Sequence, residues 1–162
     1  MSAPKSRRDD LEIERVGPED VFPLRTRVFR PLLVGIRPFR HSLDDAESAR
    51  HFAARNVRGA DLAVVSFLPD PCPECDADPS FRLFSCAVDP KHRGNGVGFE
   101  LCRFGLDFLV DEYDGEGLVW GNARLATEGF WERLGFGRRG GLFRARGEPH
   151  VVMAMELVRF QT

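Results

Sequence analysis

Three glycines at alternate positions, Gly94, Gly96 and Gly98, mark the stretch of this chain that is best suited to chemistry. They follow an apolar, strand-like segment and open a long amphipathic segment that runs to Glu112. They therefore stand where a helix is expected to begin. The first turn of a helix carries unpaired N–H groups and the positive end of the helix dipole. Because glycines leave that backbone open, the spacing predicts an anion site, with a phosphate group as the favoured ligand.

Two familiar phosphate motifs do not fit this spacing. A dinucleotide-binding Gly-x-Gly-x-x-Gly fingerprint would need glycine at position 99, where Phe99 stands. A P-loop would need Gly-Lys followed by Ser or Thr, which the stretch lacks. What remains is the pattern Arg93-x-x-Gly96-x-Gly98.

The segments around the glycines predict a strand–helix–strand unit. A strand is expected over residues 81–88, a helix over about 94–112 and a second strand over 118–122. Strands joined by a helix run parallel, so this unit predicts one parallel pair. The apolar stripe expected on the helix comprises Val97, Leu101, Phe104 and Phe108, with Leu109 beside it.

The rest of the chain supplies the other elements of an α/β (α+β) fold. Strands are expected over residues 11–16, 51–55, 62–68, from 136, and over 151–157, and helices over 17–30 and 127–134. The segment 51–55 also fits a helix end, although a strand is favoured. The predicted sheet is mixed and mostly antiparallel, with flanking helices. The loop 31–42, which holds Phe39, Arg40 and His41, either lines a site or packs over a sheet edge.

Composition predicts an ordinary globular domain. The chain has 162 residues, 43% hydrophobic and 30% charged, with a formal net charge of −2. Residues 1–10 are expected to form a frayed, disordered tail and residues 11–162 a single domain. A net charge of −2 does not favour binding to nucleic acid or to an anionic membrane. No apolar run reaches the length of a membrane span and no signal-peptide core is present, so a cytoplasmic location is expected.

The four cysteines are expected to be free thiols, as in a reducing cytosol: Cys72, Cys75, Cys86 and Cys102. The pair Cys72-x-x-Cys75 supplies two ligands, whereas a structural zinc site needs four. No second pair is present, so no metal site is expected, although a homodimer would supply two such pairs. A redox role is the other alternative, but the pair does not open a helix after a strand.

Several motifs together resemble one family. Residues 88–90 (Val-Asp-Pro) followed by 93–98 resemble motif A of the GNAT superfamily, the acetyl-CoA-dependent N-acetyltransferases. Residues 122–124 (Asn-Ala-Arg) and 130–136 (Phe-Trp-Glu-Arg-Leu-Gly-Phe) resemble later blocks of that family in the right order. The resemblance covers most of the chain from about Leu11. Residues 27–31, and Pro149 with His150, resemble a bacterial subgroup that carries Pro-His before its last strand.

The resemblance implies how acetyl-CoA, the cosubstrate, is held. Backbone N–H groups would cradle its pyrophosphate, from Arg93, Gly94, Asn95, Gly96, Val97 and Gly98. The strand Cys86-Ala87-Val88 would pair with the pantetheine arm, and the Cys86 N–H would face the thioester carbonyl as an oxyanion donor. Asn122 would lie beside the pantetheine, where the two parallel strands splay apart. Phe130 would border the cofactor, although simple core packing is the preferred reading of this residue.

The implied reaction is direct transfer of the acetyl group to an amine of a small molecule or a peptide. The sulfur of Cys86 is disfavoured as a nucleophile because no neighbouring histidine or carboxylate is expected to lower its pKa. His150 is the leading candidate for the general base, with a hydrogen-bonded structural role as the equal alternative. Asp44, Asp45 and Glu128 are weaker candidates.

Trp131 is a departure from the family pattern. It stands where the family usually has the tyrosine that protonates the leaving thiolate, and an indole N–H cannot lose a proton at working pH. The only tyrosine, Tyr113, is expected at the far end of the long helix. The alternative function is therefore a catalytically silent acyl-CoA-binding or regulatory protein on the same fold.

Overall fold

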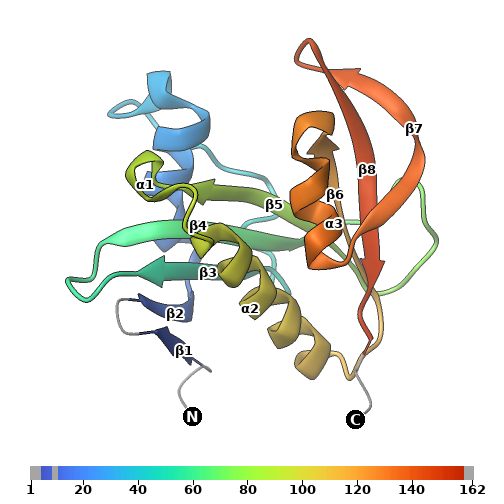
Figure 1. The fold of residues 1–162 in the computed structure, drawn as a ribbon, viewed down its shortest axis with the longest axis horizontal. Helices are drawn as coiled ribbons and strands as arrows, with labels where there is room; N and C mark the ends of the chain where they lie inside the picture. Colours follow the sequence, from blue (N-terminus) through green and yellow to red (C-terminus); the bar gives the residue numbers. More distant parts are fainter. Residues whose placement is uncertain (1–4, 9–10, 159–162) are drawn as a thin grey trace.

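The computed structural model describes residues 5–8 and 11–158. One sheet of eight strands runs through it in the order β1-β2-β3-β4-β5-β6-β8-β7 (Figure 1). Neighbouring strands are antiparallel except β5 and β6, which are parallel. The strands are β1 Lys5–Arg8, β2 Leu11–Val16, β3 Arg50–Arg55, β4 Asp61–Pro69, β5 Ser80–Val88, β6 Leu118–Arg124, β7 Gly137–Ala145 and β8 Glu148–Glu156. The predicted mixed, mostly antiparallel sheet with one parallel pair is confirmed.

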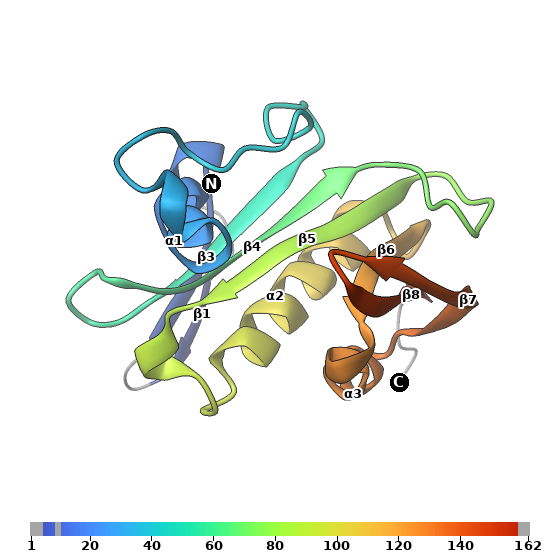
Figure 2. The ribbon, with the colours of Figure 1, turned by 90° about the horizontal axis from the view of Figure 1, so that it is seen from above.

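Helices cover both faces of the sheet. α1 (Pro18–Phe29) lies on one face, and α2 (Val97–Glu112) and α3 (Glu128–Leu134) lie on the other (Figure 2). The central strand β4 has seven consecutive buried residues, as its apolar run predicts for a strand covered on both sides. Short 3-10 turns span Pro31–Leu33, Pro90–His92 and Leu125–Thr127. No helix in the described ranges is long and apolar enough to cross a membrane.

Three boundaries differ from the sequence expectations. Residues 5–8, expected in a frayed tail, form β1 and pair with β2, while residues 1–4 and 9–10 of that tail lie outside the described chain. α2 begins at Val97 rather than Gly94, because Gly94 and Gly96 both have φ of +82°, which a right-handed helix cannot contain. β8 begins at Glu148, so Pro149 and His150 lie within it.

The buried face of α2 also differs from the predicted stripe. Phe104 and Phe108 are only partly buried and meet Phe52 edge-on, whereas Cys102 and Leu106 are fully buried. The reason is Gly105, where a Cβ atom would lie 2.3 Å from Cε2 of Phe67. The helix packs closest where it has no side chain, and this rotates both phenylalanines towards the edge of the contact.

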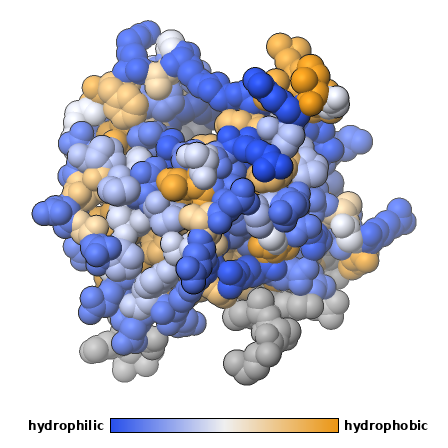
Figure 3. All heavy atoms as spheres, turned by 180° about the vertical axis from the view of Figure 1, so that it is seen from behind, coloured by the Kyte–Doolittle hydropathy of each residue, from blue (hydrophilic) through white to orange (hydrophobic). Residues whose placement is uncertain are grey.

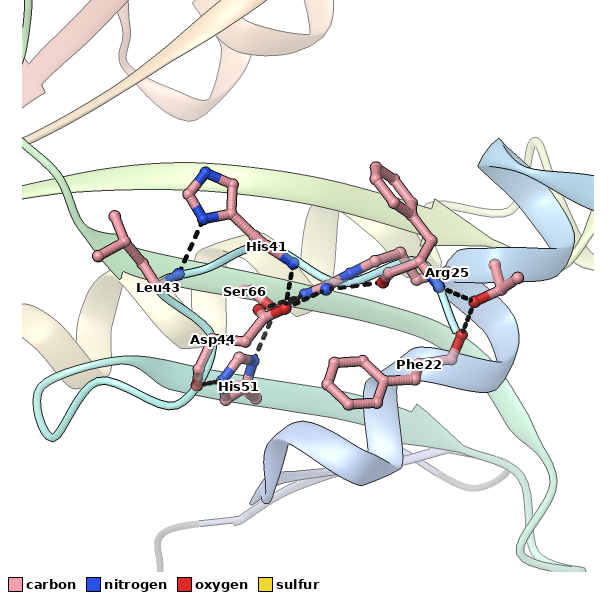
Figure 4. A network of polar contacts seen from close by, with 9 residues as sticks. Phe22, Arg25, His41, Leu43, Asp44, His51 and Ser66 are labelled. Carbon is pink, nitrogen blue, oxygen red and sulfur yellow. Dashed lines mark hydrogen bonds and ion pairs between the residues drawn. The ribbon is translucent and has the colours of Figure 1, made fainter. Parts of the chain in front are cut away.

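A buried ion pair fastens the loop between α1 and β3 to the sheet (Figure 4). Arg25 of α1 donates from Nη1 to Asp44 Oδ2 at 2.8 Å and from Nη2 to Asp44 Oδ1 at 3.0 Å. The two side chains are 0% and 1% exposed. Arg25 Nη2 also donates to Ser66 Oγ on β4 at 2.6 Å. One guanidinium therefore joins the helix, the loop and the central strand.

His51 of β3 completes this network through its two ring nitrogens. Its Nδ1 lies 2.6 Å from Ser66 Oγ, and its Nε2 lies 2.9 Å from the carbonyl oxygen of Asp44. Because Ser66 Oγ accepts a hydrogen bond from Arg25, its hydroxyl proton can be donated to Nδ1 of His51. The proton of the neutral His51 ring is then on Nε2, which donates to the carbonyl oxygen of Asp44. This arrangement assigns a neutral ring. Burial lowers the pKa of His51, which favours the same state.

Removing the loop carboxylate should strongly destabilise the fold. We expect Asp44→Ala to lower the free energy of unfolding by about 3–5 kcal/mol, because Arg25 would be left as an unpaired buried charge. The matched control is Asp45→Ala, at the exposed neighbouring position, with an expected change within about 0.5 kcal/mol. Urea denaturation of both variants measures the difference, and equal effects would contradict the assignment.

Stability should also depend on pH through His51. Its pKa in the folded state lies below the ordinary 6.5, so below pH 6.5 the unfolded chain binds more protons than the folded one. We therefore expect stability to fall as pH drops from 6.5 through the folded pKa, by at most about 1.4 kcal/mol per pH unit for this single group. The pKa of His41 is also lowered, so the comparison needs both His51→Gln and His41→Gln. A slope between pH 7 and 5 that His51→Gln leaves unchanged would refute the assignment.

Candidate active site

The start of α2 has the open backbone that the glycine spacing predicts. Gly96 is the N-cap of the helix, in the left-handed region. A Cβ atom on Gly94 or Gly96 would meet nothing within 4 Å, so glycine is required there by the backbone twist and not by packing. Within the described chain, no acceptor takes a hydrogen bond from the N–H groups of Gly94, Asn95 or Gly96. These amides are free to bind an anion.

Gly98 has a different reason to be glycine. A Cβ atom there would lie 3.0 Å from Cγ2 of Val88 and 3.6 Å from the sulfur of Cys86. The first turn of α2 therefore rests directly on the end of β5. This contact sets the open amides beside the backbone of residues 86–88, the strand expected to hold the pantetheine arm.

The two parallel strands separate just before Asn122, as the resemblance to the family implies. Pairing of β5 with β6 covers Ser80–Arg82 and Leu118–Trp120 and then stops. On the other side of β5, the register against β4 shifts between Val64 and Ser66, so that Ser85 and Cys86 together face one residue. Ser85 has φ of +56°, the left-handed conformation that glycine adopts in one class of bulge and that is uncommon for other residues. The bulge turns Cys86 and Val88 towards α2, whereas Arg82, Phe84 and Ala87 point towards α1.

The sulfur of Cys86 faces another thiol. It lies 3.5 Å from the sulfur of Cys102 on α2. The hydrogen bond with Cys86 and burial raise the pKa of Cys102. No histidine or carboxylate of the described residues makes a hydrogen bond with either sulfur. The structure therefore provides no base that would activate Cys86 as a nucleophile.

His150 and Asn122 lie on the α1 side of the sheet. His150 pairs with Arg124 across β8 and β6, and its ring stacks on Phe143 at 5.7 Å between centroids. Its Nδ1 lies 3.0 Å from the carbonyl oxygen of Glu148, so Nδ1 carries the proton and Nε2 keeps a free lone pair. The exposed Asn122 comes two positions after Trp120, the last residue of β6 that pairs with β5. It therefore flanks the opening between these two strands.

Trp131 and Phe130 lie on the opposite side, on α3. The indole of Trp131 covers Gly121, where a Cβ atom would be 2.3 Å from Cη2 of the ring, and it meets Phe136 edge-on at 5.0 Å. Phe130 meets Phe99 of α2 edge-on at 6.3 Å. Both side chains pack against the main core while staying partly exposed. Tyr113 follows the last residue of α2, far from the glycines, as expected.

Three further side chains gather at the opening on the α1 side. Phe84 of β5 is contacted by His41 at 4.9 Å between ring centroids and by the guanidinium of Arg82 at 5.2 Å. His41 Nδ1 accepts a hydrogen bond from the N–H of Leu43 at 3.0 Å, so in the neutral ring the proton is on Nε2. Burial, followed by the charge of Arg82, lowers the pKa of His41. Only the loop of His41 was expected near a site; Arg82 and Phe84 could have been found from their alternation with buried neighbours.

α1 and the segment after it also line an open pocket of about 530 Å³. Its lining is Glu19, Phe22, Pro23, Thr26, Arg27, Val34, Gly35, Ile36, Arg37 and Pro38. Arg27 pairs with Asp89 at 3.2 Å, just before the glycine-rich turn. The segment leaves Leu32 and Ile36 largely exposed, and a hydrophobic cluster stands at the corresponding upper corner of the molecule seen from behind (Figure 3).

The Cys72–Cys75 pair lies away from these groups, in the loop between β4 and β5. The two sulfurs are 2.8 Å apart. Cys72 packs against Leu118 and Trp120, and burial raises its pKa to about 11. Over the part of the chain that the structure describes, no cluster of three or more His, Cys, Asp or Glu side chains is placed to hold a metal.

Comparison with known proteins gives one consistent answer. The profile of the acetyltransferase (GNAT) family matches residues 22–136. The chain is 28% identical to the uncharacterised N-acetyltransferase YitI of Bacillus subtilis over 144 residues, which cover 88% of this chain and 94% of that protein.

Solved structures share the fold. An acyl-CoA N-acyltransferase from Pseudomonas aeruginosa superposes with a TM-score of 0.70 at 20% identity, over 89% of this chain and 98% of that one. Escherichia coli ElaA gives a TM-score of 0.70 at 18% identity, over 90% and 99% of the two chains. A Vibrio cholerae spermidine N-acetyltransferase variant gives 0.63 at 14% identity, over 93% and 95%. The family profile over residues 22–136 shows that the chain belongs to the GNAT family and is an acyl-CoA-dependent acetyltransferase, and the solved structures show that it shares the fold.

Proposed function

We propose that the protein transfers an acetyl group from acetyl-CoA directly to an amine of a small molecule or a peptide. The observation that carries the proposal is the set of unpaired amides at Gly94, Asn95 and Gly96, set by Gly98 against the end of β5 where β5 and β6 part. The residues present fit a CoA pyrophosphate, because no side chain fills the space above the two glycines in the left-handed conformation. Acetyl-CoA, when bound, supplies the acetyl group.

Each element has a role in this proposal. The N–H groups of residues 93–98 bind the pyrophosphate, apart from that of Val97, which donates to Asn95 Oδ1. The backbone of residues 86–88 binds the pantetheine arm, with Asn122 on the opposite strand. The Cys86 N–H polarises the thioester carbonyl as an oxyanion donor. The amine nitrogen forms the new bond to the carbonyl carbon as the carbon–sulfur bond breaks, so no covalent enzyme intermediate arises.

Proton transfer is assigned to His150 and to water. The free Nε2 of His150 accepts a proton from the attacking amine, because Nδ1 is held as a donor to Glu148. Trp131 covers Gly121 and supplies no acidic proton, so water protonates the leaving thiolate. The Pro-His subgroup, a cytoplasmic location, a single domain over residues 11–162 and a homodimer stay predictions.

The second candidate is a catalytically silent acyl-CoA-binding protein, which the position of Trp131 favours. Both candidates require acyl-CoA binding, and they differ in whether an amine causes release of free CoA. A panel of amines with acetyl-CoA and a thiol reagent separates them. Polyamines belong in that panel because one structural neighbour is a spermidine N-acetyltransferase.

Gly96→Glu should abolish stabilisation by acetyl-CoA. The new carboxylate would occupy the space above the open amides, and its negative charge would repel the pyrophosphate. At a ligand concentration 100 times Kd, the unmodified protein should gain about 2.7 kcal/mol, and the variant essentially none.

Gly59→Glu is the matched control for this experiment. Gly59 has φ of +81° and, like Gly96, nothing within 4 Å of a Cβ atom, but it lies in the turn between β3 and β4. The Gly59→Glu variant should lose a similar amount of stability to backbone strain. It should nevertheless keep its stabilisation by acetyl-CoA in a thermal-shift assay. Retention of that response by Gly96→Glu would refute the cradle.

The sulfur of Cys86 should matter little to turnover. We expect Cys86→Ala to lower kcat by no more than about ten-fold, whereas loss of a covalent nucleophile costs on the order of a million-fold in a serine protease. Cys102→Ala removes the same sulfur contact from the other side and serves as the control. Amine-dependent release of CoA measures both, and a collapse of kcat in Cys86→Ala alone would favour a covalent route.

A further inference from the structure

Among the arginines of the described chain whose side chains are not exposed, Arg82 alone donates no side-chain hydrogen bond. The remaining arginines that are not exposed each donate at least one hydrogen bond: Arg25, Arg30, Arg50, Arg55, Arg103 and Arg139. The side chain of Arg82 is 24% exposed, and none of its guanidinium N–H groups has a hydrogen-bond acceptor among the described residues. Its nearest carboxylate is Asp70, at 3.8 Å, which is an ion pair without a hydrogen bond. Burial lowers the pKa of Arg82, as expected for a guanidinium that has lost water and gained little in return.

Aromatic rings hold this guanidinium in place. Its central carbon lies 5.2 Å from the centre of Phe84 and 5.3 Å from the centre of Trp120. Trp120 is itself fixed, because its Nε1–H donates to the carbonyl oxygen of Asp70 at 2.7 Å. Arginine stacks favourably on aromatic faces, and stacking leaves the N–H edge of the fork available. The guanidinium is thus oriented in advance, but within the described chain no anion accepts a hydrogen bond from it.

Arg82 also stands at the point where β5 and β6 part. It is the last residue of β5 that pairs with β6, opposite Trp120. Its side chain projects to the α1 side of the sheet, whereas Cys86 and Val88 project to the α2 side, where the open amides lie. With acetyl-CoA bound through α2, the acceptor must approach the opening from the other face. That is the face on which the guanidinium is exposed.

The neighbouring groups favour an anion over a cation. His41 contacts Phe84 and, with Nδ1 engaged by Leu43, presents Nε2–H as a donor. Asp44 is buried and accepts two hydrogen bonds from Arg25, so its negative charge is already paired with that guanidinium. Asp70 is the one partly exposed carboxylate that the structure gives Arg82 as a partner. A polyamine would find donors here rather than the carboxylates it needs.

We propose that Arg82 binds a carboxylate on the acceptor, and that the acceptor is a small amine that carries a carboxylate group. This inference rests on the proposed acetyl transfer and names the class of its acceptor. The planar fork of a guanidinium matches a carboxylate with two parallel hydrogen bonds, a geometry that lysine cannot offer. His41 contributes a further donor through Nε2.

The test compares amino acids and dipeptides with their carboxamides as acceptors. kcat/KM is measured for each matched pair with the unmodified enzyme and with Arg82→Gln. The unmodified enzyme should prefer the carboxylate form, and Arg82→Gln should reduce that preference about ten- to hundred-fold, as for loss of a hydrogen bond to a charged group. The difference in amine pKa between acid and amide cancels, because it is the same for both enzymes. Arg82→Lys should restore only part of the preference.

Arg124→Gln is the matched control, since Arg124 is an exposed arginine of the adjacent strand β6. If Arg124→Gln reduces the preference as much as Arg82→Gln does, a diffuse positive field rather than Arg82 selects the acceptor, and the proposal is wrong. An unmodified enzyme that uses the carboxamides as well as the acids also overturns it.

Binding of products separates this inference from the proposed function. N-acetyl amino acids and their amides are titrated calorimetrically into the CoA-saturated protein, which needs no turnover. A preference for the acid that Arg82→Gln removes supports the anion site even if no amine releases CoA, and in that case only the catalytic proposal fails. Equal binding of acid and amide, or binding of neither, counts against the role of Arg82.

Discussion

The parting of β5 from β6 after Arg82 and Trp120 is the constraint on which the rest of the structure depends. Buried backbone N–H and C=O groups must find partners, and a strand that leaves its neighbour exposes a row of them. From Leu83 onwards the β6 side of β5 has no paired strand. An extended chain with amide groups, such as a pantetheine arm, is the kind of ligand that such an edge can bind. The missing pairing is thus what makes room for a ligand in the middle of a continuous sheet.

Much of this arrangement could be predicted from local patterns. The alternate glycines locate the start of α2, and the seven-residue apolar run locates the doubly covered strand β4. The helix between two strands fixes the parallel pair, since such connections follow few geometries. The closing Gly135, with φ of +112°, ends α3 as its position after Leu134 indicates. Each of these features depends on residues that are close together in the sequence.

The features that could not be predicted depend on contacts between distant segments. The face of α2 is set by Gly105 against Phe67, which periodicity within the helix cannot show. The Arg25–Asp44 pair joins residues 19 positions apart, and the contact of Arg25 with Ser66 spans 41. Likewise, the sequence characterises Trp131 only by the tyrosine it replaces in the family pattern, whereas its position in the fold follows from the absence of a side chain at Gly121. Side-chain type alone does not specify such partners.

The bulge at Ser85 has a consequence for how this strand can change. Side chains of a strand alternate between faces, so one extra residue reverses the assignment of everything beyond it. If the bulge were flattened so that Ser85 took a regular place in the strand, Cys86 and Val88 would turn towards α1, and Ala87 would turn against Gly98. The sequence would be unaltered, yet the two faces beyond Ser85 would be exchanged. Deleting Ser85 would instead keep the faces, because residues 84, 86, 87 and 88 already alternate with the bulge residue left out. Point substitution can tune either side of this sheet separately, but an inserted residue that joined the alternation would alter both sides at once.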